Sequence, residues 1–189
     1  METSLRSLTR QTDLSQFRSL IRSVRPDISE SVLISLEKII DSSDCKNIRF
    51  EKMSSRAAGI SKTDECVIST NVLTLPIEYL VYIILHEVSH QHQYHKYGKD
   101  YVLDVYDGTL SLDEATLKLL RVEQIADRLA IWRMRGMGLN RVKPRYLGLT
   151  DTNQIKNHLS KIRKDVMMMG LTSIEEINDH IHRSINRET

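Results

Sequence analysis

An apolar run from Tyr79 to Leu85 leads without interruption into His86-Glu87-Val88-Ser89-His90, and this segment constrains the fold more than any other. Pro76 stands near its start and Gly98 just past its end, so we expect one helix from about residue 77 to residue 97. The apolar run predicts that this helix is buried. The residues that follow the run place two imidazoles and a carboxylate on the same helix.

The two histidines and the glutamate form an H-E-x-x-H pattern. On a helix, positions i and i+4 share a face, so His86 and His90 can both reach one metal ion. Zinc suits imidazole nitrogen and accepts a tetrahedral site with one open position. Glu87 lies on the same turn as His86, where it can take a proton from a water activated by the metal and return it to a leaving amine. We therefore expect one zinc ion (Zn2+) per chain.

A later segment offers the third ligand that a catalytic zinc usually has. Glu123 and Asp127 are again i and i+4 on a predicted helix, and the small residues Ala126 and Ala130 near that face allow close approach to the first helix. Glu123 is the expected ligand. Asp127 is expected to accept a hydrogen bond from the far ring nitrogen of a ligand histidine and so to fix its tautomer. The alternatives for the third ligand are Asp100, Asp104 and Asp107.

The H-E-x-x-H pattern followed by an E-x-x-A-D helix resembles the gluzincin metallopeptidases. The resemblance implies that His86, His90 and Glu123 bind zinc, that Glu87 is the general base and that Asp127 orients a histidine ligand. The short gap from His90 to Glu123, the small size of the chain and the A-D-x-x-A ending are most similar to small intracellular members such as the ImmA/IrrE-type domain. The resemblance covers about residues 48–135 and implies a zincin-like fold.

The sequence departs from the family pattern at two points. Gluzincins commonly use a further His or Tyr to stabilise the tetrahedral oxyanion, and no spacing assigns one here. The ImmA/IrrE-type pattern usually has an aromatic residue where Leu129 stands. The metzincin pattern H-E-x-x-H-x-x-G-x-x-H is disfavoured, because Gln93 and Lys96 replace its glycine and third histidine. The candidates for the oxyanion role are Tyr97, Tyr101, Tyr106, His158 and His180.

Residues 66–71, with the sequence CVISTN, form the best predicted strand of the chain. In the resembling folds an edge strand before the active helix pairs with the substrate backbone. The resemblance therefore places Ser69, Thr70 and Asn71 beside an extended peptide substrate, bound by β-addition.

The remaining pattern predicts helices around a small sheet, and hence an α+β class. With this pattern, the resemblance to the gluzincins implies a zincin-like domain. Ile48 and Phe50 alternate with polar residues as in a strand, and Gly59 with the polar stretch 61–65 indicates a hairpin. We expect an N-terminal helical segment packed on the core over residues 1–46, a zincin-like metallopeptidase core over 47–138 and a C-terminal helical segment over 139–189.

Capping patterns predict where several of these helices begin. Asp27 with Glu30 resembles a capping box that opens the second N-terminal helix, and Ser111 with Glu114 opens the long helix that carries Glu123. The two exposed-type histidines His92 and His95 are expected at a solvated helix end. The run Met167–Met169 is expected to be a packed helix end.

Charge and composition exclude several classes. The chain has 27 basic and 25 acidic residues, a net charge of +2, which is too even to indicate nucleic-acid binding, so nucleic acid is a weakly supported partner. The longest apolar run is far too short for a membrane span, and residues 1–16 lack the apolar core of a signal peptide. We therefore expect a cytoplasmic protein with no membrane partner. The two cysteines, Cys45 and Cys66, make no disulfide framework and are expected to be buried thiols.

These observations predict a zinc-dependent endopeptidase that hydrolyses a protein or peptide substrate, with Glu87 as general base. The alternative is a non-catalytic protein in which zinc is structural and the helical ends bind a protein or a nucleic-acid-associated partner.

Overall fold

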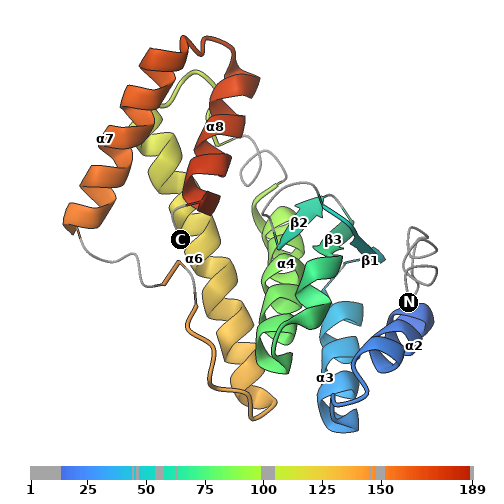
Figure 1. The fold of residues 1–189 in the computed structure, drawn as a ribbon. Helices are drawn as coiled ribbons and strands as arrows, with labels where there is room; N and C mark the ends of the chain where they lie inside the picture. The colour runs from blue at the N-terminus through green and yellow to red at the C-terminus, as the bar shows by residue number, and fades with distance from the viewer. Residues whose placement is uncertain are drawn as a thin grey trace.

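The computed structural model describes residues 14–43, 45, 47–53, 58–62, 64–98, 105–144, 146–147 and 152–187. Within these residues, six α-helices and one 3-10 helix surround a sheet of three strands, which confirms the α+β class (Figure 1). In chain order the elements are α2 (Leu14–Val24), α3 (Glu30–Asp41), β1 (Asn47–Glu51), β2 (Gly59–Lys62), β3 (Glu65–Ser69), the 3-10 helix η1 (Thr70–Thr74), α4 (Ile77–Tyr97), α6 (Leu112–Gly136), α7 (Thr152–Met169) and α8 (Ile174–Arg187).

The two long helices begin and end where their capping residues predict. Pro76 caps the start of α4, and Gly98 follows its end with φ of 85°, in the left-handed region that favours glycine. At the start of α6, the Ser111 side chain accepts a hydrogen bond from the Glu114 N–H, and the Glu114 carboxylate accepts one from the Ser111 N–H. Local sequence therefore fixes the length of both helices that carry the predicted site.

The predicted capping box at Asp27 and Glu30 is wrong. The N-cap of α3 is Ser29, whose side chain accepts a hydrogen bond from the Val32 N–H. Asp27 instead accepts two hydrogen bonds from the Arg25 guanidinium. Ile28 precedes the helix, and its side chain is still buried in the core.

The sheet has the strand order β1-β3-β2, so the prediction of an edge strand over residues 66–71 is wrong. Strand β3 pairs in parallel with β1 and antiparallel with β2, in a hairpin where Gly59 lies opposite Ile68. Residues 70 and 71 belong to η1 rather than to the strand. The physical reason is that Cys66, Val67 and Ile68 are all buried, which suits a central strand covered on both faces.

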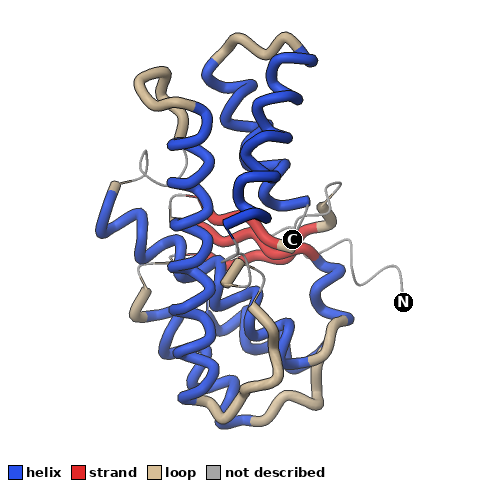
Figure 2. The backbone as a smooth tube through the Cα atoms, turned by 90° about the vertical axis from the view of Figure 1, so that its left-hand side faces the viewer, coloured by secondary structure: helices blue, strands red, loops and turns tan. Residues whose placement is uncertain are grey.

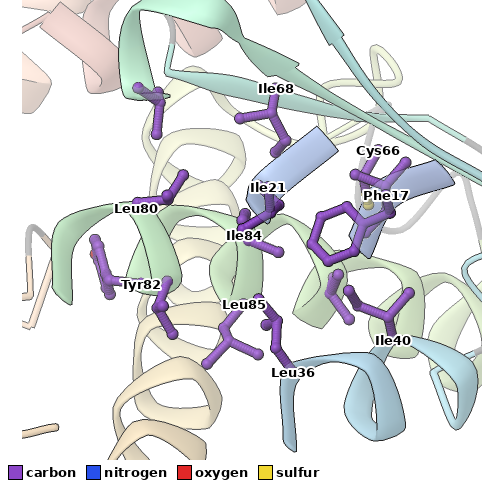
Figure 3. Packing of buried hydrophobic residues seen from close by; sticks show 14 of the residues in the cluster. Phe17, Ile21, Leu36, Ile40, Cys66, Ile68, Leu80, Tyr82, Ile84 and Leu85 are labelled. Carbon is purple, nitrogen blue, oxygen red and sulfur yellow. The ribbon is translucent and has the colours of Figure 1, made fainter. Parts of the chain in front are cut away.

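Helix α6 connects two hydrophobic clusters. Its C-terminal half, with Ala130 and Met134, packs into the cluster formed by α2, α3, α4 and the sheet. Figure 3 shows Phe17 and Ile21 of α2, Leu36 of α3 and Ile84 of α4 meeting in that cluster. The N-terminal half of α6 packs against α7 and α8 in a second cluster (Figure 1). In Figure 2 the strands cross the middle of the molecule, with helices above and below them.

Two expectations about helix surfaces have different outcomes. His92 and His95 are exposed on α4, as expected for a solvated helix end. The methionines at the end of α7 are not packed, because Met167, Met168 and Met169 are 81%, 71% and 62% exposed. Among the described helices, we find none with the length and apolar character needed to cross a bilayer.

Candidate metal centre

Three buried side chains from α4 and α6 bring their metal-binding atoms together. The Nε2 atom of His86 lies 3.0 Å from Oε2 of Glu123 and 3.2 Å from Nε2 of His90. The distance from Nε2 of His90 to Oε2 of Glu123 is 3.6 Å. Ligand atoms at about 2.0–2.1 Å from a tetrahedral zinc are about 3.3 Å apart, so the three distances fit one face of such a tetrahedron. His86, His90 and Glu123 could therefore hold a metal ion.

Close packing of the two helices makes this arrangement possible. Ala126 and Ala130, on the α6 face that meets α4, are completely buried. Their small side chains allow the Glu123 carboxylate of α6 to reach the imidazoles of α4. The sequence predicted these two alanines for that role.

Asp127 fixes the orientation of His86. Its Oδ1 lies 3.0 Å from Nδ1 of His86 and also accepts a hydrogen bond from the Tyr82 hydroxyl. Its Oδ2 accepts hydrogen bonds from the backbone N–H groups of Tyr146 at 2.6 Å and Leu147 at 3.1 Å. Because a carboxylate only accepts, Nδ1 of His86 donates to Asp127, and Nε2 faces Glu123, where a bound metal ion would take the place of its proton. The predicted role of Asp127 is consistent with this geometry.

Gln93 orients the second histidine in the same way. Its Oε1 accepts a hydrogen bond from Nδ1 of His90 at 2.9 Å, and its Nε2 donates to the carbonyl oxygen of Val122 on α6 at 2.8 Å. The bond to Val122 fixes which end of the amide faces His90, so Nδ1 of His90 is also the protonated nitrogen. Both imidazoles therefore present Nε2 to the same point.

The charges of the centre favour a cation between its three side chains. Burial lowers the pKa of His86, but hydrogen bonds with Asp127 and Glu123 outweigh it and raise the pKa to about 10. Burial raises the pKa of Glu123, but His90 and His86 outweigh it and hold the pKa well below its usual range. The cluster therefore stabilises positive charge next to Glu123, which a bound metal ion also supplies.

Glu87 lies beside the three residues that could bind a metal and contacts strand β2 of the sheet. Its side chain is 8% exposed, and this burial raises its pKa, while the neighbouring His86 and His90 oppose the shift. A Cβ atom placed on Gly59 of β2 would lie 2.6 Å from Cγ and 2.7 Å from Oε1 of Glu87. Any side chain at position 59 therefore displaces Glu87, and the absence of one at Gly59 sets where this carboxylate lies.

The strand next to Glu87 is β2, and α4 holds it by side-chain hydrogen bonds. Gln91 donates from Nε2 to Ser61 Oγ at 2.5 Å and to the Lys62 carbonyl at 2.6 Å, and its Oε1 accepts from the Asp64 N–H at 3.0 Å. The Tyr94 hydroxyl donates to the Ser61 carbonyl at 2.8 Å. These contacts fasten the β2–β3 hairpin to the helix that carries His86 and His90.

The outer edge of β2 offers main-chain groups beside the centre. The Ser69 N–H donates to the Ala58 carbonyl at 2.8 Å, which makes this an inward-facing pair. In an antiparallel pair every second residue faces the partner strand, so Ala58, Ile60 and Lys62 direct their N–H and C=O groups towards β3. Gly59 and Ser61 are the residues between, and their N–H and C=O groups turn away from β3. The Ser61 carbonyl already accepts the Tyr94 hydroxyl, so the main-chain groups that a peptide can join are those of Gly59. The edge that an extended peptide can join is therefore on β2, not on the predicted segment 66–71.

The other predicted residues lie elsewhere in the fold. Ser69 is buried and caps η1 by accepting a hydrogen bond from the Asn71 N–H, while Thr70 is the first residue of that helix. Asp107 accepts hydrogen bonds from Thr109 in the turn before α6. Of the oxyanion candidates, Tyr97 lies at the end of α4, Tyr106 packs on the second cluster, and His158 and His180 lie on α7 and α8. Asp100, Tyr101 and Asp104 lie outside the described residues.

Four residues of the centre were not predicted from the sequence. Tyr82 precedes His86 by one helical turn and Gln93 follows His90 by almost one turn, so spacing along α4 was a usable signal for both. Gly59 and Tyr146 come from distant segments, and no local pattern indicates their roles. The Tyr146 ring stacks on the His86 ring, with centroids 5.7 Å apart and an interplanar angle of 27°.

The chain was also compared with known proteins. No family model, no curated protein and no solved structure matches it.

Proposed function

We propose that this chain is a zinc-dependent peptidase with a zincin-like fold, similar in its site to the gluzincins. The observation that carries the proposal is the meeting of His86, His90 and Glu123 at distances that fit a tetrahedral metal, with Glu87 next to them. Two histidines and one glutamate are a common ligand set of catalytic zinc, which leaves the fourth position for water or substrate.

The residues of the chain divide the chemistry among them. A zinc ion held by this set supplies Lewis acidity, which lowers the pKa of water and polarises a peptide carbonyl. Glu87 takes the proton of the attacking water on its carboxylate and later gives it to the leaving amine. Asp127 and Gln93 hold the Nδ1 protons of His86 and His90, and so keep both Nε2 atoms directed at one point.

Main-chain pairing at β2 is the proposed mode of substrate binding. Gly59 touches Glu87 and is also the residue whose N–H and C=O groups turn outward from the sheet, so an extended peptide that pairs with it would bring its own backbone close to Glu87. Pairing of this kind depends on the peptide backbone more than on side chains. The substrate class is therefore an extended segment of a protein or peptide.

The direct test compares wild-type protein with Glu87→Gln. Zinc content is measured by elemental mass spectrometry, and cleavage is measured on a proteome-derived peptide library by mass spectrometry of new termini. We expect equal zinc in both proteins and a loss of cleavage of about 10²–10⁴-fold in the variant. Glu78→Gln, on the first turn of the same helix, is the matched control and retains activity. A Glu87→Gln protein that cleaves at the wild-type rate would refute the mechanism.

A second candidate function is a zinc-stabilised binding protein without catalysis. The observation in its favour is the exposed run Met167–Met169 at the end of α7, where flexible apolar side chains meet solvent. Wild-type protein that carries zinc, loses stability with a chelator and cleaves no peptide of the library would support this function over hydrolysis.

A further inference from the structure

Two cysteines that are distant in the sequence lie in contact in the fold. Cys45 stands before β1 and Cys66 lies in the central strand β3, yet their Sγ atoms are 3.4 Å apart, within hydrogen-bonding distance for thiols. In a disulfide the two sulfurs are about 2.05 Å apart, so bond formation needs a relative movement of only about 1.4 Å. The sequence predicted two separate buried thiols and gave no reason to pair them.

The two thiols differ in their surroundings. Cys66 is completely buried, whereas Cys45 keeps 8% of its surface exposed. The hydrogen bond between the two thiols lowers the pKa of Cys45, and burial raises the pKa of Cys66. A thiolate is the form of cysteine that reacts with oxidants, so Cys45 is the thiol suited to react first and Cys66 the thiol suited to follow.

We propose that Cys45 and Cys66 are a redox-active dithiol, which a peroxide converts to an intramolecular disulfide. The Cys45 thiolate attacks one peroxide oxygen, the O–O bond breaks, and Cys45 becomes a sulfenic acid. The hydroxide that leaves takes up the proton that Cys45 released on ionising and forms water. The Cys66 sulfur then attacks the Cys45 sulfur, the S–O bond breaks, and the hydroxide leaves as water with the Cys66 proton. Two thiols lose two electrons in total, and one hydrogen peroxide is reduced to two waters.

The dithiol is linked to the metal centre through one residue. Ser61 lies opposite Cys66 in the hairpin, with its Oγ 3.9 Å from the Cys66 sulfur. The same Oγ accepts the hydrogen bond from Gln91 of α4, one residue beyond His90. Oxidation of the Cys66 sulfur therefore affects the hydrogen bond between Ser61 and Gln91, which connects β2 to α4.

The test uses the full chain and hydrogen peroxide, and its readout is independent of peptidase activity. Folded protein is treated with peroxide, free thiols are blocked with N-ethylmaleimide, and peptides are mapped by mass spectrometry with and without dithiothreitol. Peptide mapping is needed because the exposed methionines at the end of α7 also take up oxygen. We expect a Cys45–Cys66 linked peptide that disappears on reduction, and loss of both maleimide adducts.

Single variants test the order of the two steps. In Cys66→Ser we expect Cys45 to stop at the sulfenic acid, which dimedone traps, whereas Cys45→Ser gives no dimedone adduct on folded protein. The wild-type mapping needs no variant, so it decides the proposal even if a serine variant does not fold. The proposal is overturned if folded wild-type protein keeps both thiols after peroxide, or if its disulfides join only separate chains. A dimedone adduct on Cys66 in the Cys45→Ser variant would overturn the assigned order.

Discussion

Replacing Gly59 by alanine adds one methyl group at the point where β2 touches Glu87. The new Cβ would lie 2.6 Å from Cγ, 2.7 Å from Oε1 and 2.8 Å from Cδ of Glu87, whereas ordinary contacts begin near 3.4 Å. The Glu87 side chain must therefore move by about 0.8 Å, because its contact with Gly59 involves Cγ and not only the flexible end. The metal ligands are untouched by this change.

The expected loss of activity follows from the displacement. A misplacement of about 1 Å in a catalytic group can cost about 100-fold in rate, which corresponds to about 2.7 kcal/mol of transition-state stabilisation. We expect kcat/KM of Gly59→Ala to fall by about that factor on a peptide identified from the library, with zinc content equal to that of wild type. The protein should still fold, but at a lower Tm, because overpacking costs about 1–3 kcal/mol. The lower entropy of the unfolded chain offsets only about 0.4–1 kcal/mol of that cost.

Gly136 provides a matched control for this substitution. It ends α6, and a Cβ placed on it meets no atom within 4 Å. Gly136→Ala should therefore keep full activity and unfold at the same or a slightly higher temperature. If Gly59→Ala cleaves within twofold of wild type, then the contact with β2 does not set the working position of Glu87.

Three further predictions concern the metal and its support. Glu123→Ala removes one of three ligands and should weaken zinc binding by more than about 100-fold, because even the loss of a residue that supports a ligand costs about 10–100-fold. Competition with a fluorescent chelator measures the Kd, and an unchanged Kd would place the third ligand elsewhere. Tyr82→Phe removes one donor to Asp127 and should weaken the zinc affinity by about 10-fold, with an unchanged circular dichroism spectrum. Equal zinc affinity would show that the Tyr82 hydroxyl does not support the metal ligands. When free zinc is at about 1,000 times its Kd, its removal by a chelator should lower the free energy of unfolding by about 4 kcal/mol and the Tm by about 8–16 °C. An unchanged Tm in wild type would argue against a metal bound to the folded protein.

Local patterns predicted the parts of the centre that lie on single helices. The i, i+4 spacing of His86 and His90 and of Glu123 and Asp127 follows from helix geometry, and Pro76 and Gly98 gave the limits of α4. The α+β class also followed from strand and helix periodicity. These features depend on neighbours in the sequence, so the sequence alone was sufficient.

Contacts between distant segments were not predictable in the same way. The approach of Gly59 to Glu87 depends on the hairpin register, and the contact of Cys45 with Cys66 depends on the parallel pairing of β1 with β3. The central position of β3 was the exception, because consecutive apolar residues in Cys66–Ile68 indicate a strand that is covered on both faces. The resemblance predicts an edge position for residues 66–71, whereas the apolar composition of the segment correctly indicates a central strand.

Asp127 receives two of its hydrogen bonds from peptide groups rather than from side chains. Most replacements at positions 146 and 147 keep the backbone N–H, so they leave the two hydrogen bonds to Asp127 unchanged. Proline is the exception, since it has no N–H to donate. Insertions or deletions between α6 and residue 146 are different, because they change where the N–H groups stand. In related chains, the length of this connection should therefore vary less than its residues, and loop length is the better criterion for recognising the same support in a distant sequence.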